Sequence, residues 1–212
     1  MRPSIRTLLC LLAACLAAAA AGARAEEMPP DVLVKTVTLE VIDLIARDEG
    51  IKSGSREKLL RLIDEKVLPH FDFVGMTAHV AGQAWNKADA GQKQRLAREF
   101  KTLLVRTYAA TLQAYSGQKL EFRPLRARPG DTDVVVTVRV MQPGAQPVPI
   151  DYSMEKSAQG WKVYDVAVGG VSLIANYRTA FTPRLRDNGI EGLIAELQRK
   201  NHPDVNAQAS KQ

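Results

Sequence analysis

The spacing of apolar residues changes twice along the chain, and these changes constrain the fold more than any other feature. Up to about residue 115, apolar residues recur every three or four positions, which is the period of an amphipathic helix. From Lys119 to Val168 they alternate with polar residues, the period of a strand with one buried face. After Gly169-Gly170 the helical period returns. Helices on both sides of a block of consecutive strands predict an α+β domain, with an antiparallel sheet packed against helices.

The helical parts of the sequence are bounded by capping residues, glycines and prolines. Asp89 and Gln92 stand three residues apart, as in a capping box, just before the longest apolar stripe. Gly189 interrupts the stripe that follows the strands, so we expect two helices there. The expected helices span residues 31–48, 55–68, 89–115, 172–188 and 190–200.

The strand block predicts a meander of about four strands joined by tight turns. Pro143-Gly144 marks one of these turns, and Gly169-Gly170 is expected to end the sheet. Near Asp165 the alternation slips by one residue, which predicts a β-bulge. The expected strands span residues 119–123, 133–140, 148–155 and 161–168.

The first 25 residues have the organisation of a cleaved signal peptide. Arg2 and Arg6 precede an apolar stretch over 8–21, and Ala23-Arg24-Ala25 fits a small-x-small cleavage site. The alternative is a lipoprotein acylated at Cys15, but the alanine-rich stretch after Cys15 is not the polar tether typical of lipoproteins. We therefore expect signal peptide 1–25, one domain over residues 26–201, and a polar, disordered tail over 202–212.

Composition excludes several classes of function for the mature chain. Both cysteines, Cys10 and Cys15, lie in the signal segment, which leaves no disulfide, thiol nucleophile or cysteine metal site. Without the arginines of that segment, 26 basic residues face 23 acidic ones, a net charge of +3 that is too small for a nucleic-acid footprint. No later stretch reaches the roughly 18 apolar residues of a membrane span. We expect a soluble protein that binds no nucleic acid.

Motifs for catalysis and metal binding are missing from the sequence. It contains no G-x-S-x-G elbow, P-loop, G-x-G-x-x-G or H-E-x-x-H pattern. His70 and His79 with Asp72 could ligate a metal, but their spacing fits no known metal site. We expect instead that His70 stands at a helix C-terminus and that Asp72 caps the next segment.

Three polar residues on the central strands allow one enzymatic reading. Asp165 would form an acid–base pair with a tyrosine, Tyr152 or Tyr164, if a curved sheet enclosed them in a cavity. A small-molecule isomerase or hydratase on a cone-shaped sheet would use such a pair. The simpler interpretation is that Asp165 occupies the bulge and accepts hydrogen bonds from backbone amides, and we favour it because no partner for Asp165 is evident.

The apolar faces of the strands and of the long helix predict a packed core as readily as a ligand cavity. More specific are four motifs that follow one another along residues 31–200. They comprise Leu68-Pro69-His70-Phe71-Asp72-Phe73 with Met76, Gly82 and Trp85; the long helix with Arg95, Phe100, Leu104, Tyr108 and Tyr115; Trp161-Lys162-Val163-Tyr164-Asp165-Val166 with Gly170-Val171-Ser172-Leu173-Ile174, Asn176-Tyr177-Arg178 and Phe181; and Gly189-Ile190-Glu191-Gly192-Leu193. In order and spacing they resemble the motifs of the MlaC (toluene-tolerance) family.

This resemblance implies a periplasmic phospholipid carrier of the Mla pathway, with no catalytic activity and no cofactor. Such a carrier exchanges lipid with an outer-membrane lipoprotein complex and with an inner-membrane ABC transporter complex that has a substrate-binding ring. The implied fold is a curved antiparallel sheet with helices, NTF2-like in general shape, that holds acyl chains in a deep apolar cavity. The expected lipid-binding residues are Val74, Met76, Leu104, Tyr108, Val136, Val138, Val140, Ile150, Tyr152, Met154, Trp161, Val163, Val171 and Ile174.

Overall fold

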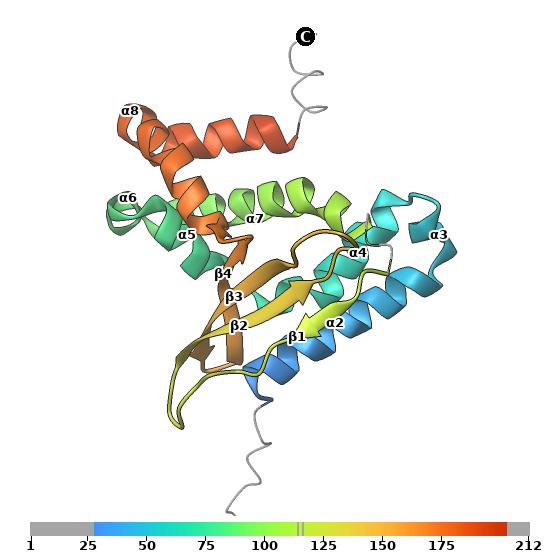
Figure 1. Ribbon diagram of the computed structural model, residues 1–212. Helices are drawn as coiled ribbons and strands as arrows, with labels where there is room; N and C mark the ends of the chain where they lie inside the picture. Colours follow the sequence, from blue (N-terminus) through green and yellow to red (C-terminus); the bar gives the residue numbers. More distant parts are fainter. Residues whose placement is uncertain (1–27, 114, 116, 203–212) are drawn as a thin grey trace, which may run out of the picture.

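The computed structural model describes residues 28–113, 115 and 117–202 (Figure 1). The expected signal peptide and residues 203–212 of the expected tail lie outside the described residues. The helices are α2 (Pro30–Arg47), α3 (Glu49–Lys52), α4 (Arg56–Lys66), the 3-10 helix η1 (Leu68–His70), α5 (Phe73–Ala81), α6 (Gln83–Lys87), α7 (Ala90–Gln113) and α8 (Leu173–Asn201). The strands are β1 (Leu120–Phe122), β2 (Asp133–Val140), β3 (Val148–Ser157), β4 (Gly160–Val168) and β5 (Val171–Ser172).

The strands form one antiparallel sheet in the order β1-β2-β3-β4-β5, so each strand pairs with its neighbour in sequence. This confirms the α+β class. The sheet has one strand more than expected, because Gly169 and Gly170 form a tight turn instead of ending the sheet. Both glycines have positive φ, 59° and 83°, which allows Val171 to pair with Val168.

The bulge in β4 lies one residue before Asp165, close to its expected position. Ser153 of β3 pairs with Asp165, whereas the next residue, Met154, pairs with Val163. Tyr164 is therefore the extra residue of β4. Its side chain leaves the face that carries Val163, and its hydroxyl donates to Asp133 at 3.0 Å.

The capping box expected at the start of the long helix is formed. The backbone N–H of Gln92 donates to Asp89 Oδ1 at 2.8 Å, and the Gln92 side chain accepts from the Asp89 N–H at 3.0 Å. Ser172 caps α8 by accepting from the N–H of Ala175 at 3.0 Å. At Gly189, with φ 63° and ψ −171°, α8 bends into two helical segments, which confirms the expected break.

The elements form two regions around the sheet. Figure 1 shows α2 running along one side of the sheet, and α5, α7 and α8 gathered beyond the end of β4. α2 contacts β2, whereas β4 contacts η1, α5 and α8. Buried apolar residues of α5, α7 and α8 make up what we call the helical cluster: Met76, Val80, Ala81, Leu96, Phe100, Leu103, Leu104, Phe181, Leu193, Ile194 and Leu197. The sheet cluster comprises Val34, Val134, Val136, Val138, Met154 and Val163.

A third apolar cluster joins α2 to α4 and α7. Val41 and Ile45 of α2 lie with Leu59 and Ile63 of α4 and with Ala109 of α7. This cluster fixes the C-terminal half of α2 against other helices, while the N-terminal half, with Val34, covers the sheet. α2 is thus the element that closes the apolar face of the sheet.

Candidate functional site

The strand register gathers one apolar face of the sheet. Val138 lies opposite Ile150, Val136 lies opposite Tyr152, and on the next pair of strands Met154 lies opposite Val163. Directly paired residues point to the same side of a sheet, so these side chains share one face. The valines at 136, 138 and 163 and Met154 are at most 3% exposed, and Val34 of α2 packs against them.

Tyr152 differs from its buried neighbours on this face. Burial by the surrounding protein raises the pKa of Tyr152 to about 12. The residue nevertheless keeps an accessible surface intermediate between buried and exposed. Both observations hold if Tyr152 is surrounded by protein but incompletely packed against it. We therefore expect a hollow between the sheet and the helices at the position of Tyr152.

Other side chains around the sheet cluster are also incompletely buried. Ile150 and Val166 flank Tyr152 on β3 and β4, and Trp161 lies at the start of β4. All three are intermediate in exposure. Apolar side chains in a finished core are normally closed off from water, so this half-buried set is the best candidate for contact with an apolar ligand.

The structure does not gather all fourteen expected lipid-binding residues in one wall. Val136, Val138, Tyr152, Met154, Trp161 and Val163 belong to or pack on the sheet cluster, with Ile150 and Val140 on the same face. Met76, Leu104, Tyr108 and Ile174 belong to or pack on the helical cluster. Val74 and Val171 are 58% and 62% exposed. Val74 and Met76 are two residues apart on α5, so they point to opposite sides of that helix.

Several residues of the apolar face were missed by the sequence reasoning. Val34 of α2 lies in the sheet cluster, and Phe71 and Val166 pack against it. The apolar stripe of the first helix was a usable signal for Val34, since an amphipathic helix must cover some apolar surface. Phe71 reaches the sheet through a bridge with Val163, and the N–H of Asp72 donates to the Val163 carbonyl at 2.9 Å. No local pattern predicts this long-range pairing.

An apolar cavity of about 450 Å³ opens near the other end of α2. Ile42, Ile45 and Ile51 line it together with Tyr115, which follows α7. Within the described part of the chain, Lys52 is the one charged residue that lines this cavity. The cavity lies beside the cluster of α2, α4 and α7, and we treat it as a candidate extension of the apolar space under α2.

Asp165 connects the bulge of β4 to the start of α8 through hydrogen bonds. Its Oδ1 accepts from the N–H groups of Val166 and Ile174 at 2.8 and 3.1 Å, and its Oδ2 accepts from the Ser172 hydroxyl at 2.5 Å. This confirms the expectation that Asp165 accepts hydrogen bonds from backbone amides, although the residue that occupies the bulge is Tyr164 and not Asp165. Among the described residues no hydrogen bond joins Asp165 to Tyr152 or Tyr164. The arrangement does not favour the isomerase or hydratase alternative.

The residues considered as metal ligands have other contacts. Asp72 caps α5 by accepting from the N–H of Gly75 at 2.9 Å, as expected. The ring of His79 lies 5.6 Å from that of Tyr164, whose pKa is raised by burial and by Asp133. His70 ends η1, and its pKa is lowered by burial and then by the nearby Lys162 charge. Within the described ranges, no three His, Cys, Asp or Glu residues gather as a metal site would require.

The fold resembles that of a protein solved in complex with a lipid. The structure of a phospholipid-binding protein from Ralstonia solanacearum in complex with a phospholipid matches with a TM-score of 0.77 and 36% sequence identity, covering 83% of this chain and 98% of that chain. The protein is therefore an α+β protein with the architecture of a known phospholipid-binding protein. The profile of the MlaC protein family matches residues 35–199. The chain belongs to the MlaC family, which confirms the resemblance seen in the sequence.

Two characterised relatives agree with this assignment. The chain is 24% identical to the intermembrane phospholipid transport system binding protein MlaC of Haemophilus influenzae, over 82% of this chain and 82% of that protein. It is 29% identical to the toluene tolerance protein ttg2D of Pseudomonas putida, over 82% of this chain and 84% of that protein. In the part of the chain that the structure describes, every helix is too short or too polar to cross a membrane.

Proposed function

We propose that this protein is a periplasmic carrier that takes up a phospholipid and moves it between the outer and inner membranes of a Gram-negative-type envelope. The observation that carries the proposal is the likeness of this chain to a protein solved with a bound phospholipid, which extends over 98% of the length of that protein. Support from this chain comes from Tyr152, which is screened from water without being closely packed.

The acyl chains would lie on the face that carries Ile150, Tyr152, Trp161 and Val166, under α2. Of the fourteen expected lipid-binding residues, those on the sheet are the best supported, because they share one face beside the hollow. Val136 and Val138 are buried under α2. They would contact lipid only after α2 moves outward.

A carrier of this kind is needed because lipid monomers do not cross water unaided. Each buried CH₂ is worth about 0.8 kcal/mol, so two long acyl chains represent more than roughly 20 kcal/mol against water. A bilayer buries the same chains, so transfer from membrane to carrier is close to neutral. A nearly neutral carrier works in both directions, and its partners set the net flow.

The partners follow from the family. We infer that the protein exchanges lipid with an outer-membrane lipoprotein complex and with an inner-membrane ABC transporter complex that has a substrate-binding ring. We also infer that no cofactor or catalytic residue takes part. Each transfer is then an exchange of one amphiphile between apolar environments, with no bond made or broken.

The binding step is tested by lipid extraction. The full chain is expressed in a Gram-negative host, purified from the periplasmic fraction, and extracted for mass spectrometry. We expect phospholipid at about one molecule per protein. A folded protein without phospholipid contradicts the proposal. N-terminal sequencing of the same sample should start at Glu26, whereas an acylated Cys15 would show that the protein is a lipoprotein.

The transport step is tested with donor and acceptor vesicles separated by a dialysis membrane that only the protein crosses. A carrier moves labelled phospholipid across the membrane at a rate that rises with protein concentration. A protein that only tethers membranes moves none in this arrangement. Bovine serum albumin loaded with fatty acid serves as a control for leakage of the labelled lipid.

A further inference from the structure

One row of paired residues crosses the sheet from the buried core to the surface. Val138 of β2 pairs with Ile150 of β3, which pairs with Val168 of β4. Val168 in turn pairs with Val171 of β5. Directly paired residues point to the same side of a sheet, so the whole row lies on the face of the sheet cluster. Val138 is 2% exposed and Ile150 is half-buried, whereas Val168 and Val171 are 44% and 62% exposed. The apolar face therefore reaches solvent where β4 turns into β5.

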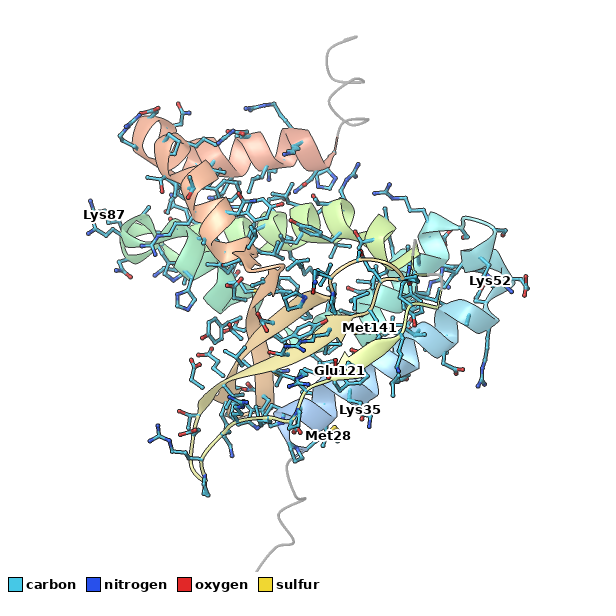
Figure 2. The ribbon with its side chains drawn as sticks, viewed as in Figure 1. Met28, Lys35, Lys52, Lys87, Glu121 and Met141 are labelled. Carbon is cyan, nitrogen blue, oxygen red and sulfur yellow. The ribbon has the colours of Figure 1, made fainter. Side chains whose placement is uncertain are left out.

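Two turns without charged residues border this end of the row. The Gly169-Gly170 turn joins β4 to β5, and the turn between β2 and β3 begins at Met141 (Figure 2). The N–H of Gly169 donates to the Pro149 carbonyl at 2.8 Å, so the first turn lies against the start of β3. Residues 140–150 and 166–172 contain no Asp, Glu, Lys, Arg or His, in a chain of which 25% is charged. We call these two segments the uncharged edge.

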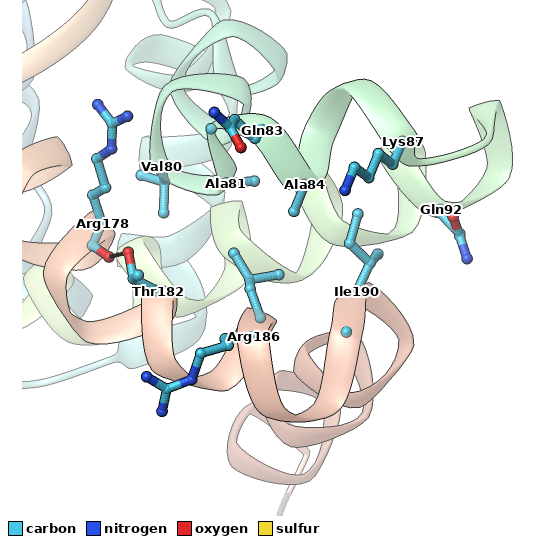
Figure 3. A pocket seen from close by; sticks show the side chains of 13 residues that line it. Val80, Ala81, Gln83, Ala84, Lys87, Gln92, Arg178, Thr182, Arg186 and Ile190 are labelled. Atoms are coloured by element: carbon cyan, nitrogen blue, oxygen red, sulfur yellow. Dashed lines mark hydrogen bonds between the residues drawn. The ribbon is translucent and has the colours of Figure 1, made fainter.

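The other hollows of the molecule differ from this edge. A groove of about 720 Å³ at the bend of α8 is lined by Lys87, Arg178 and Arg186 among its residues (Figure 3). Figure 2 shows Lys87 far from Met141. In the described part of the chain, no strand residue lines this groove or the cavity of about 450 Å³ near the end of α2. Among these three places, the uncharged edge is the one that shares paired residues with the face of the sheet.

The exposed valines of the uncharged edge are held in place by the backbone around them. Gly169 and Gly170 both have positive φ, which allows a two-residue turn between paired strands. The Ser172 hydroxyl, next to Val171, donates to Asp165 Oδ2 at 2.5 Å, and this ties β5 back to β4. Valine side chains have a single stiff torsion. Val168 and Val171 thus form a fixed apolar rim at the end of the row.

We propose that the uncharged edge is the entrance of the phospholipid site, and that Val168 and Val171 lie against the bilayer when an acyl chain enters or leaves. The proposal rests on the carrier function proposed above. A chain that follows the row keeps apolar contact from the bilayer to Ile150, so less of it meets water at any moment. A bilayer fits this edge better than a protein partner does, because Trp, Tyr and Arg, the usual anchors of protein interfaces, are absent from residues 140–150 and 166–172.

The rate of lipid uptake tests the entrance. Delipidated protein is mixed with phosphatidylcholine vesicles that contain fluorescent, self-quenched phospholipid, and both the initial rate and the lipid bound at saturation are measured. Val168→Gln/Val171→Gln should slow uptake and release about tenfold, because a polar rim raises the barrier to passage. The lipid bound at saturation should stay the same, since the hollow itself is unchanged. Glutamine adds no charge, so the attraction to head groups is not altered.

The matched control removes two exposed apolar side chains elsewhere. Leu39 of α2 is 46% exposed, and Val135, on the other face of β2, is 52% exposed. Leu39→Gln/Val135→Gln should take up lipid at the wild-type rate. If the double rim variant misfolds, the single variant Val171→Gln is used, because Val171 is the more exposed of the two valines.

Methyl NMR locates the contact with the bilayer without any substitution. Phosphatidylcholine vesicles with a small fraction of a gadolinium-chelating lipid broaden the signals of methyl groups that come close to the head groups. We expect stronger broadening at Val168 and Val171 than at Leu39 and Val135, although all four side chains are exposed to similar degrees.

The possible results separate the entrance from the carrier function. Equal uptake rates of the rim variant and the wild type would overturn the entrance, and so would a loss of lipid at saturation in the folded rim variant, which would place the valines inside the binding site. Broadening that is absent, or strongest at Leu39, would show that the uncharged edge does not meet the bilayer. A wild-type protein that takes up no phospholipid contradicts the carrier function itself, whereas normal wild-type uptake with an unaffected rim variant contradicts the entrance alone.

Discussion

The helical cluster and the sheet cluster are both apolar, but they differ in how completely they are closed. In the helical cluster Phe100 and Leu193 are 0% exposed, and the ring of Phe100 meets the rings of Tyr177 and Phe181 edge-on, with centroids 5.1 and 5.8 Å apart. On the sheet, buried valines share a face with the half-buried Tyr152. The helical cluster is closed from solvent, whereas the sheet face keeps side chains that are only half-buried, which is where the proposed carrier would hold its ligand.

The largest effect is expected in the helical cluster. Phe100→Ala removes a ring that is in contact on all sides, so we expect a loss of about 3–5 kcal/mol in the free energy of unfolding. Urea unfolding measures this loss, with Phe100→Leu as the milder control. Phospholipid per folded protein should stay as in the wild type. A selective loss of lipid in folded Phe100→Ala protein would contradict the division between the two regions.

The next prediction compares two positions that face each other on the sheet. Val138 is buried under α2, so Val138→Trp should overpack and cost about 1–3 kcal/mol. Its partner Ile150 is half-buried, so the indole of Ile150→Trp should enter the hollow at a cost below about 1 kcal/mol. Both costs are measured by thermal unfolding of delipidated protein, because bound lipid stabilises the folded state.

The same pair sharpens the assignment of the lipid site. Ile150→Trp should lower the phospholipid content to less than about half, since the indole takes space beside Tyr152. A matched substitution in the other region, Ile174→Trp, should keep its phospholipid. Equal destabilisation by Val138→Trp and Ile150→Trp, with no change in lipid, would show that the sheet face is as closed as the helical cluster.

A smaller effect is expected where the two regions meet. Asp165→Asn replaces a carboxylate oxygen that accepts from the Ser172 hydroxyl and weakens the bonds to the N–H groups of Val166 and Ile174. We expect a loss of about 1–3 kcal/mol. Asp187→Asn, at an exposed ion pair, is the control and should cost less than about 1 kcal/mol. Chemical unfolding of both variants gives the comparison, and equal losses would argue against a special role of Asp165.

The smallest effect concerns pH. Burial and the Lys162 charge lower the pKa of His70 below its ordinary value of 6.5. Between the lowered pKa and 6.5 the unfolded chain binds more protons than the folded one, so the stability linked to His70 is present above pH 6.5 and is lost as the pH falls. His70→Gln should remove this loss. Because His70 is partly exposed, we expect a change of only about 1–2 °C in Tm between pH 7 and 5.

The control for His70 is His79→Gln, which removes another histidine beside a different set of groups. A change of the same size in both variants would show that the effect does not belong to His70. Neither variant should lose phospholipid, since both residues lie outside the half-buried set on the sheet.

Much of the fold could be predicted because its signals are local. The change of apolar period locates the strand block, the Asp89–Gln92 pair marks the start of α7, and Gly189 marks the bend in α8. Each of these depends on residues within one turn of the chain. The fifth strand was missed because a Gly-Gly turn and a sheet end look alike in sequence, and only the pairing of Val171 with Val168 distinguishes them.

The candidate site was less predictable, because periodicity shows which residues share a face but not which element covers them. Val138 and Ile150 have the same pattern in sequence, yet Val138 is buried in the sheet cluster and Ile150 is half-exposed. Val74 was expected to contact lipid but is exposed, because only one side of α5 faces the helical cluster. The contact of Phe71 with β4 depends on residues about 90 positions apart, for which one sequence carries no signal.

The hydrogen bonds at β4 bear on how the domain changes volume. Asp165 joins β4 to α8 by accepting from the N–H of Ile174. β4 is also joined to the segment around η1, because the Asp72 N–H donates to the Val163 carbonyl and Lys162 Nζ donates to the Pro69 carbonyl. α2 contacts the sheet through apolar side chains and through Lys35, whose ammonium lies 6.0 Å from the Phe122 ring. β4, η1 and α8 should therefore move as one rigid body. The C-terminal half of α2 is held by α4 and α7, also through the ion pair of Glu40 with Lys66, whereas its N-terminal half contacts the sheet. We expect an opening of the sheet face to start at the N-terminal half of α2, at the cost of exposing Val34 and the valines that it covers.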